Sequence, residues 1–71
     1  MAPSTTADAR KAFGERLLLE RRRQGRSQAD VAAAMNTDQG VVSRAELGKT
    51  TIETQLRVAA ELGIEIMDPP T

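Results

Sequence analysis

The chain has 71 residues, which is enough for one small domain with a thin hydrophobic core. It contains no cysteine and no histidine, which excludes disulfides, thiol chemistry, the usual zinc ligand sets and the commonest general base. Its ten basic and ten acidic residues cancel, but segment 10–26 holds seven basic and only two acidic residues, so the chain can still present a positive face.

The first seven residues, MAPSTTA, show no hydrophobic periodicity, and we expect them to form a flexible N-terminal arm. No apolar segment is long enough for the core of a leader peptide or for a membrane span. The sequence therefore predicts a cytoplasmic protein.

A first helix is predicted over residues 8–24. Phe13 and Leu17 are four residues apart and share one face, and Arg21 continues that stripe. Residues 17–19 are three consecutive leucines, and successive helical positions point about 100° apart. At least one of these leucines is therefore expected to be exposed or to meet a partner. A glycine then ends the helix.

A second helix is predicted over residues 27–35, SQADVAAAM. Ser27 is a good N-cap, and Asp30 at the third helical position is a weaker variant of the capping box. Only two residues separate this helix from the next, so a tight turn must join them. The side chains expected to face inward are those of Val31, Ala32 and Met35.

The third predicted helix lies within NTDQGVVSRAELG, residues 36–48, with Thr37 as its cap. Apolar packing comes only from Val41, Val42 and Ala45, whereas the other face is formed by Gln39, Gly40, Ser43 and Arg44. A glycine inside a helix costs about 1 kcal/mol relative to alanine. On an exposed face, Gly40 therefore suggests that something outside the chain approaches closely.

A fourth helix is predicted from Thr50 or Thr51 to Leu62. Its inward residues are expected to be Ile52, Leu56, Ala59, Ala60 and Leu62. The tail IEIMD that follows alternates apolar and acidic residues, which is the period of a β-strand. A lone strand cannot satisfy its own backbone, so residues 64–71 are expected to need a partner strand.

Residues 15–63 resemble the phage-repressor (Cro/xenobiotic-response-element) type of helix-turn-helix domain. The ordered features that carry the likeness are Ser27-Gln28, Ala32, Val42-Ser43, Glu46, Gly48 and Leu62-Gly63. The resemblance implies an all-α, lambda-repressor-like DNA-binding domain of four to five short helices over residues 8–63. Segment 50–68 is similar to the HipB-like antitoxin branch, which implies a C-terminal strand that pairs across a two-fold dimer through Ile64, Ile66 and Met67.

The chain departs from the family pattern at several core positions. Family members usually have an aliphatic residue where this chain has Gln24, Arg26 and Gln55, and a larger one than Ala45. We therefore expect a weaker monomer core, compensated by a dimer contact.

Three groups of functional residues are predicted on this basis. The residues predicted to contact DNA bases are Gln39, Ser43 and Arg44, because glutamine can read adenine and arginine can read guanine in the major groove. The residues predicted to contact the DNA backbone are Gln28, Thr37, Lys49 and Thr50. The resemblance further implies that Arg21 and Glu46 form an ion pair that ties the first helix to the recognition helix.

The sequence thus predicts a homodimeric repressor on a palindromic operator, and an antitoxin that binds a cognate toxin. An adaptor that uses the same fold to bind protein rather than DNA is the alternative. The acidic residues of the C-terminal half, Glu53, Glu61, Glu65 and Asp68, are a candidate surface for a basic partner. No catalytic constellation and no metal or cofactor motif is found in the sequence, so we do not expect an enzyme.

Overall fold

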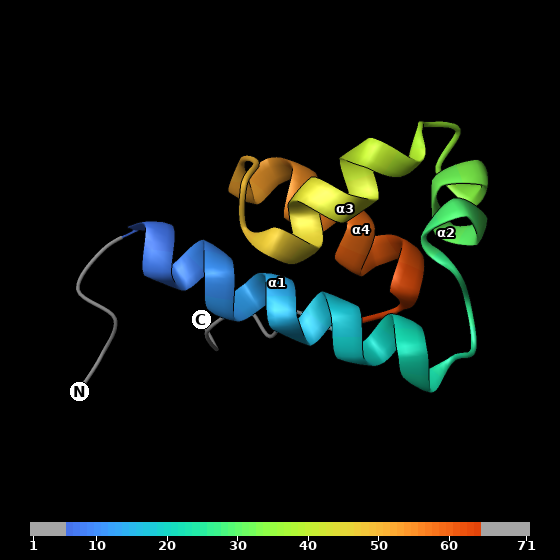
Figure 1. Cartoon of the computed structure of the whole chain (residues 1–71), viewed down its shortest axis with the longest axis horizontal. Helices are drawn as coiled ribbons and strands as arrows, with labels where there is room; N and C mark the ends of the chain where they lie inside the picture. The colour runs from blue at the N-terminus through green and yellow to red at the C-terminus, as the bar shows by residue number, and fades with distance from the viewer. Residues whose placement is uncertain (1–5, 65–71) are drawn as a thin grey trace, which may run out of the picture.

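The computed structural model describes residues 6–64, and within them it contains four α-helices (Figure 1). They are α1 (Thr6–Arg23), α2 (Gln28–Ala34), α3 (Gln39–Leu47) and α4 (Ile52–Leu62). The all-α fold is confirmed, and α1 begins two residues earlier than predicted. The tail predicted to be a strand lies outside the described residues, apart from Ile64. No helix of the described part is long and apolar enough to cross a membrane.

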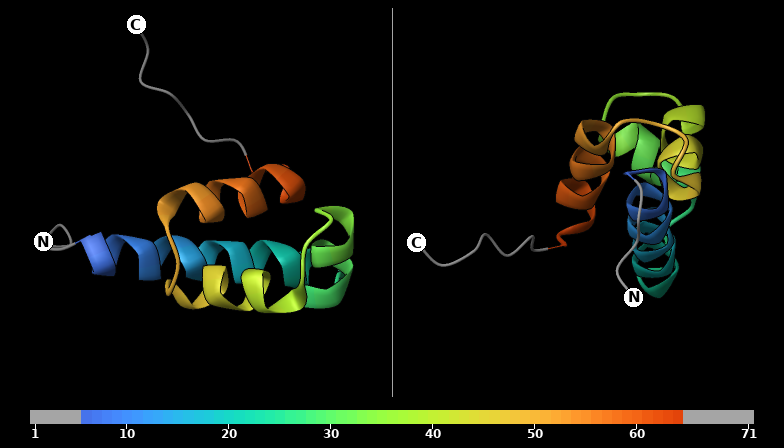
Figure 2. Two further views of the ribbon diagram at one scale, coloured as in Figure 1. Left: turned by 90° about the horizontal axis from the view of Figure 1, so that it is seen from above. Right: turned by 90° about the vertical axis from the view of Figure 1, so that its left-hand side faces the viewer.

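The long helix α1 supports the other three (Figures 1 and 2). Helices α3 and α4 both pack along α1, and α2 packs mainly against α3 at one end of the molecule. Every helix contributes to a core of aliphatic and alanine side chains. Its buried members are Leu17, Val31, Ala32, Val42, Ala45, Val58, Ala59 and Leu62, and the half-buried Phe13, Met35 and Ile64 pack against them.

Exposure of one leucine in the run at residues 17–19 is confirmed. Leu17 is fully buried, whereas 65% of Leu19 is exposed.

The predicted inward face of α4 is wrong in part. Ile52 and Leu56 are 37% and 39% exposed, and Ala60 is also exposed, whereas Gln55 and Val58 are fully buried. The helix is rotated because the Gln55 side chain donates hydrogen bonds to the carbonyl oxygens of Arg10 (2.7 Å) and Ala45 (2.9 Å). Hydrophobic periodicity does not show such a polar anchor.

The other polar residues at usually aliphatic positions also bind helix ends. The Gln24 amide donates to the carbonyl oxygen of Leu62 at 2.7 Å, and the Arg26 guanidinium donates to the Glu61 carboxylate at 2.9 Å. Carbonyls in the last turn of a helix have no partner within the helix. Gln24 therefore replaces an apolar contact by a hydrogen bond that closes the C-terminal end of α4 against α1.

The helix starts follow local signals, with one correction. Ser27 and Asp30 form the predicted capping box, with both hydrogen bonds at 2.9 Å. Thr51 caps α4, but α3 is capped by Asp38 and not by Thr37. Thr37 belongs to the turn that closes α2, where its amide donates to the Ala32 carbonyl at 2.9 Å, and Asp38 has the extended backbone of a cap and a side chain that accepts from the Val41 amide.

Two glycines allow α1 and α3 to approach closely. A Cβ atom added to Gly14 would lie 2.4 Å from the Glu46 carbonyl oxygen and 2.7 Å from that of Ala45, and both are backbone atoms. Gly48, at the end of α3, has a φ of 73°, and a Cβ there would lie 2.7 Å from the Lys11 Cα atom. The contact between these helices thus depends on the absence of side chains at both positions.

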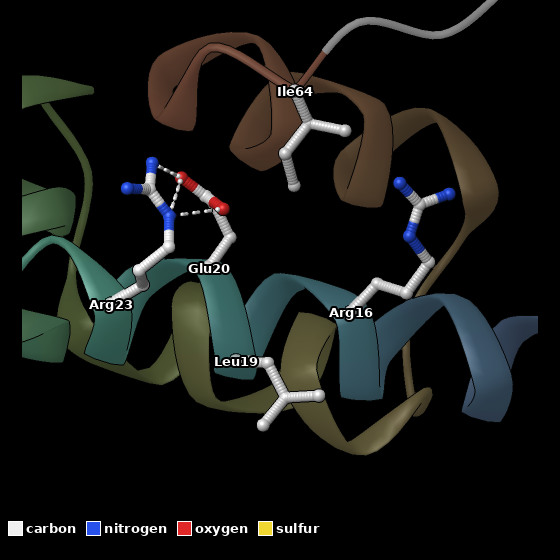
Figure 3. A pocket seen from close by; sticks show the side chains of 5 residues that line it. All are labelled: Arg16, Leu19, Glu20, Arg23 and Ile64. Atoms are coloured by element: carbon white, nitrogen blue, oxygen red, sulfur yellow. Dashed lines mark hydrogen bonds and ion pairs between the residues drawn. The ribbon is translucent and has the colours of Figure 1, made fainter.

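A shallow hollow between α1 and Ile64, two residues after the end of α4, contains an exposed ion pair (Figure 3). Arg16, Leu19, Glu20, Arg23 and Ile64 line it, and the Arg23 guanidinium binds the Glu20 carboxylate. The Gln24 amide donates a further hydrogen bond to Glu20 at 2.8 Å. The Arg23 hydrogen bonds, with help from Gln24, lower the pKa of Glu20 to about 2.

Glu20 should therefore contribute to the acid sensitivity of the fold. Because its pKa is lower in the folded state, the Glu20 contribution to stability is present above about pH 4.5 and is lost as the pH falls towards 2. We expect Glu20→Gln to make the fall in urea midpoint between pH 4.5 and 2 smaller than in the wild type. Glu15→Gln, at an exposed position of the same helix, is the control. Equal falls for both variants and the wild type would contradict the prediction.

Candidate nucleic-acid interface

Helices α2 and α3 are held at a fixed angle by a short turn. Met35 ends α2, and Asn36 adopts a left-handed conformation with a φ of 57°. After one more residue Asp38 accepts a hydrogen bond from the Val41 amide at 3.1 Å and begins α3. The buried residues of α3, which are Val42, Ala45 and Glu46, hold its inner face to the domain.

The predicted partners Arg21 and Glu46 lie together beneath α3. The Arg21 Nε atom donates to Glu46 Oε2 at 2.5 Å, and Arg21 Nη2 lies 3.2 Å from Oε1. The two side chains are 11% and 4% exposed, and the hydrogen bond to Glu46 raises the pKa of Arg21. Arg21 also donates to the Arg26 carbonyl at 2.8 Å, so one guanidinium joins α1, α3 and the segment that leads into α2.

A chain of amide hydrogen bonds runs outward from this ion pair. The Gln28 amide nitrogen donates to Glu46 Oε1 at 2.9 Å, and the Gln28 oxygen accepts from the Gln39 amide at 3.2 Å. Each glutamine amide has two N–H groups, so Gln28 keeps one for a phosphate oxygen, the contact predicted for it. These contacts of Gln28 with Glu46 and Gln39 were not predicted from the sequence. The available signal was that a glutamine begins each helix on either side of a tight turn.

The outer face of α3 carries the three residues predicted to contact bases. Gln39 and Arg44 are exposed and Ser43 is half-buried. The Arg44 side chain has no hydrogen bond or ion pair with any other residue of the described range 6–64. An exposed arginine without a partner remains available to bind an external acceptor.

Gly40 lies on the same face, and unlike Gly14 it is not packed against the backbone of another helix. A Cβ atom at Gly40 would meet only the ends of two side chains, Asp38 Oδ1 at 3.0 Å and Arg44 Nη1 at 3.1 Å. Packing within the described domain therefore does not require a glycine at this position. Leu47 adds an apolar side chain to this side of α3, where it is 58% exposed, and the sequence pattern did not indicate it.

The residues predicted to contact the DNA backbone lie at both ends of α3. Thr37 is half-buried in the turn before the helix, and Gln28 begins the neighbouring α2. Lys49 is exposed and Thr50 half-buried directly after α3. The sequence did not predict that Lys11 of α1 lies near this group. It is exposed, and its backbone lies against Gly48, beside Lys49. The structure thus places polar or cationic groups on either side of the base-reading candidates.

Comparison with protein families matches residues 17–68, which are most of the chain, to the family described as helix-turn-helix. The chain belongs to the helix-turn-helix family. In this helix-turn-helix protein α2 is the first helix of the motif and α3 is the recognition helix, which lies in the major groove of duplex DNA in such domains. Comparisons with curated proteins and with solved structures found no match.

Membership of this DNA-binding family supports the predicted nucleic-acid partner of the helix-turn-helix protein. Gln39, Ser43 and Arg44 lie on the recognition helix, on the side away from the core. Their contacts with particular bases, and the backbone contacts of Gln28, Thr37, Lys49 and Thr50, stay predictions.

Proposed function

We propose that this helix-turn-helix protein is a sequence-specific transcriptional repressor that binds a palindromic operator as a homodimer. The observation that carries the proposal is the two-sided character of α3. Its inner face is fixed to the domain through buried Val42 and Ala45 and the Arg21–Glu46 pair, whereas its outer face presents polar side chains to solvent.

Direct readout is assigned to Arg44 and Gln39. Arg44 has the donors to bind guanine O6 and N7, and Gln39 has an amide that can pair with adenine N6 and N7. The hydrogen bond from Gln39 to Gln28 restricts the orientation of the Gln39 amide before DNA binds, which lowers the entropic cost of the contact. Each good pair contributes about 1–3 kcal/mol of discrimination against the wrong base.

Dimerisation follows from how little one recognition helix reads. One α3 contacts a few base pairs, which is too little for useful specificity in a genome. Two copies related by a two-fold axis read a palindrome whose half-sites are about 34 Å apart, one turn of the duplex. Phosphate contacts then supply most of the salt-dependent affinity and set the register on the DNA.

The narrower proposal is that the repressor is the antitoxin of a toxin–antitoxin pair and controls its own operon. It is supported by the resemblance of segment 50–68 to the HipB-like antitoxins and by Glu53, an exposed acidic residue of α4 whose side chain has no hydrogen bond or ion pair to another residue of the range 6–64. Glu61, by contrast, already binds Arg26. We further propose that the protein acts by binding alone and is not an enzyme.

The salt dependence of binding tests the DNA-binding proposal. Duplexes selected from a random library by the full chain should bind at least roughly tenfold more weakly at 200 mM than at 50 mM salt, because a dimer brings at least two Lys49 side chains to phosphates. Fluorescence anisotropy at several salt concentrations measures this fall. If no sequence is enriched and no duplex is bound even at the lower salt, the protein is an adaptor and the proposal fails.

A further inference from the structure

Helix α4 carries an apolar stripe along one edge of its buried face. Ile52, Leu56 and Ala60 follow one another at four-residue spacing and therefore lie on one side of the helix. All three are exposed, the first two by 37% and 39% of their surface. Packing within the described domain covers Ile52 and Leu56 only in part, so more than a third of each side chain is left open.

Two opposite charges flank the stripe. Glu53 and Arg57 are exposed on the same flank and four residues apart, and neither has a hydrogen bond or ion pair with another side chain of the described range. In an antiparallel helix pair around a two-fold axis near Leu56, residues on the same flank of the two helices meet. Glu53 then faces Arg57 of the partner subunit, and the symmetry repeats this contact. The face is thus complementary to itself.

The surface beside the stripe has a shallow depression at the point where the antiparallel alignment of two α4 helices brings in a large side chain. Met35 of α2 and three residues of α4, Arg57, Ala60 and Glu61, line a shallow depression. The small Ala60 leaves room at this point of the helix. In the antiparallel alignment Ala60 lies opposite Ile52 of the partner subunit, which is large enough to fill the depression.

We propose that α4 is a self-association surface and that its occupant is the α4 helix of a second copy of this chain. This inference rests on the proposed homodimer and assigns its interface to α4. Because a two-fold contact fixes the two copies relative to each other, it also fixes the separation of the two α3 helices. A stripe of three apolar residues is small beside the 1,200–2,000 Å² that stable interfaces typically bury. Association is therefore weak in free solution and is strengthened when both copies bind one operator.

Charge reversal tests the pairing of Glu53 with Arg57. In the full chain, Glu53→Arg and Arg57→Glu each create two like-charge contacts in a symmetric dimer, so each should weaken self-association by at least roughly tenfold. The double variant restores opposite charges and should return to within about threefold of the wild type. Sedimentation equilibrium measures all three. Glu15→Arg and Arg22→Glu, with the same charge changes at exposed positions of α1, should leave association unchanged.

A second pair of variants tests the stripe itself. Leu56→Ser should weaken association, whereas Leu19→Ser, at a more exposed leucine of α1, should not. Circular dichroism verifies that both remain helical. Single charge reversals without effect, a double variant no better than the singles, or a wild type that stays monomeric even on a palindromic duplex would each overturn the proposal. Binding to a duplex with one half-site reports DNA recognition separately, so such a failure is distinguishable from failure of the DNA-binding proposal.

Discussion

Replacing Gly14 with alanine is expected to lower the free energy of unfolding by about 2–3 kcal/mol. The added methyl group would lie 2.4 Å from the Glu46 carbonyl oxygen, and a backbone atom in the last turn of α3 cannot move aside without separating α1 from α3. The better helix propensity of alanine offsets about 1 kcal/mol of this strain. In a domain of this size the melting temperature should fall by roughly 10–20 °C, which thermal denaturation followed by circular dichroism measures.

Gly40→Ala is the matched control for this variant, because it adds the same methyl group inside another helix. At Gly40 the new atom meets only movable side-chain ends, so the melting temperature should stay the same or rise slightly. Equal destabilisation by the two variants would show that helix contact is not the reason for glycine at position 14.

Replacing Glu46 with alanine is expected to destabilise the fold by about 3 kcal/mol. The Arg21 guanidinium would remain mostly buried, with the Arg26 carbonyl as its one other hydrogen-bond partner among the described residues. The Gln28 amide would also lose its acceptor. Urea denaturation at neutral pH, with the midpoint and the slope determined separately, measures the loss.

Two further variants identify the cause of that loss. The double change Arg21→Met with Glu46→Leu removes both charges and should recover much of the stability, because an apolar pair needs no desolvation of ions. Breaking the exposed Glu20–Arg23 pair by Glu20→Ala should have a small effect at neutral pH, since solvent screens such pairs. An unchanged urea midpoint in Glu46→Ala would mean that the buried pair does not hold α3 in place.

The features that the sequence predicts well are those that depend on neighbouring residues. The capping box of Ser27 and Asp30 and the threonine cap of α4 depend on hydrogen bonds within three residues. The inward side of α2 follows from helical spacing, and Val31 and Ala32 are indeed buried. Even the correction at Asp38 moves a cap by only one residue. These signals were sufficient to place the turn between α2 and α3, and with it the recognition helix.

The features that the sequence did not predict depend on contacts between distant segments. Gln55 rotates α4 by binding carbonyls 45 and 10 residues away in the chain. Gly14 is required by a backbone segment of α3, and a glycine within a helical pattern carries no sign of what lies against it. The orientation of Gln39 depends on Gln28 across the turn. The sequence therefore predicted which kinds of residue lie on the face that could touch DNA. The contacts that orient those side chains became visible only in the structure.

Base reading by the outer face of α3 is tested directly by one ratio of affinities. The affinity for a duplex selected by the wild type is divided by the affinity for a scrambled duplex of the same composition, for the wild type and for Arg44→Ala. We predict that Arg44→Ala lowers this ratio by at least roughly tenfold, because each half-site loses one base contact. Arg22→Ala removes the same charge from α1 and should leave the ratio unchanged. A ratio that Arg44→Ala does not alter would contradict the claim that α3 reads the operator through this residue.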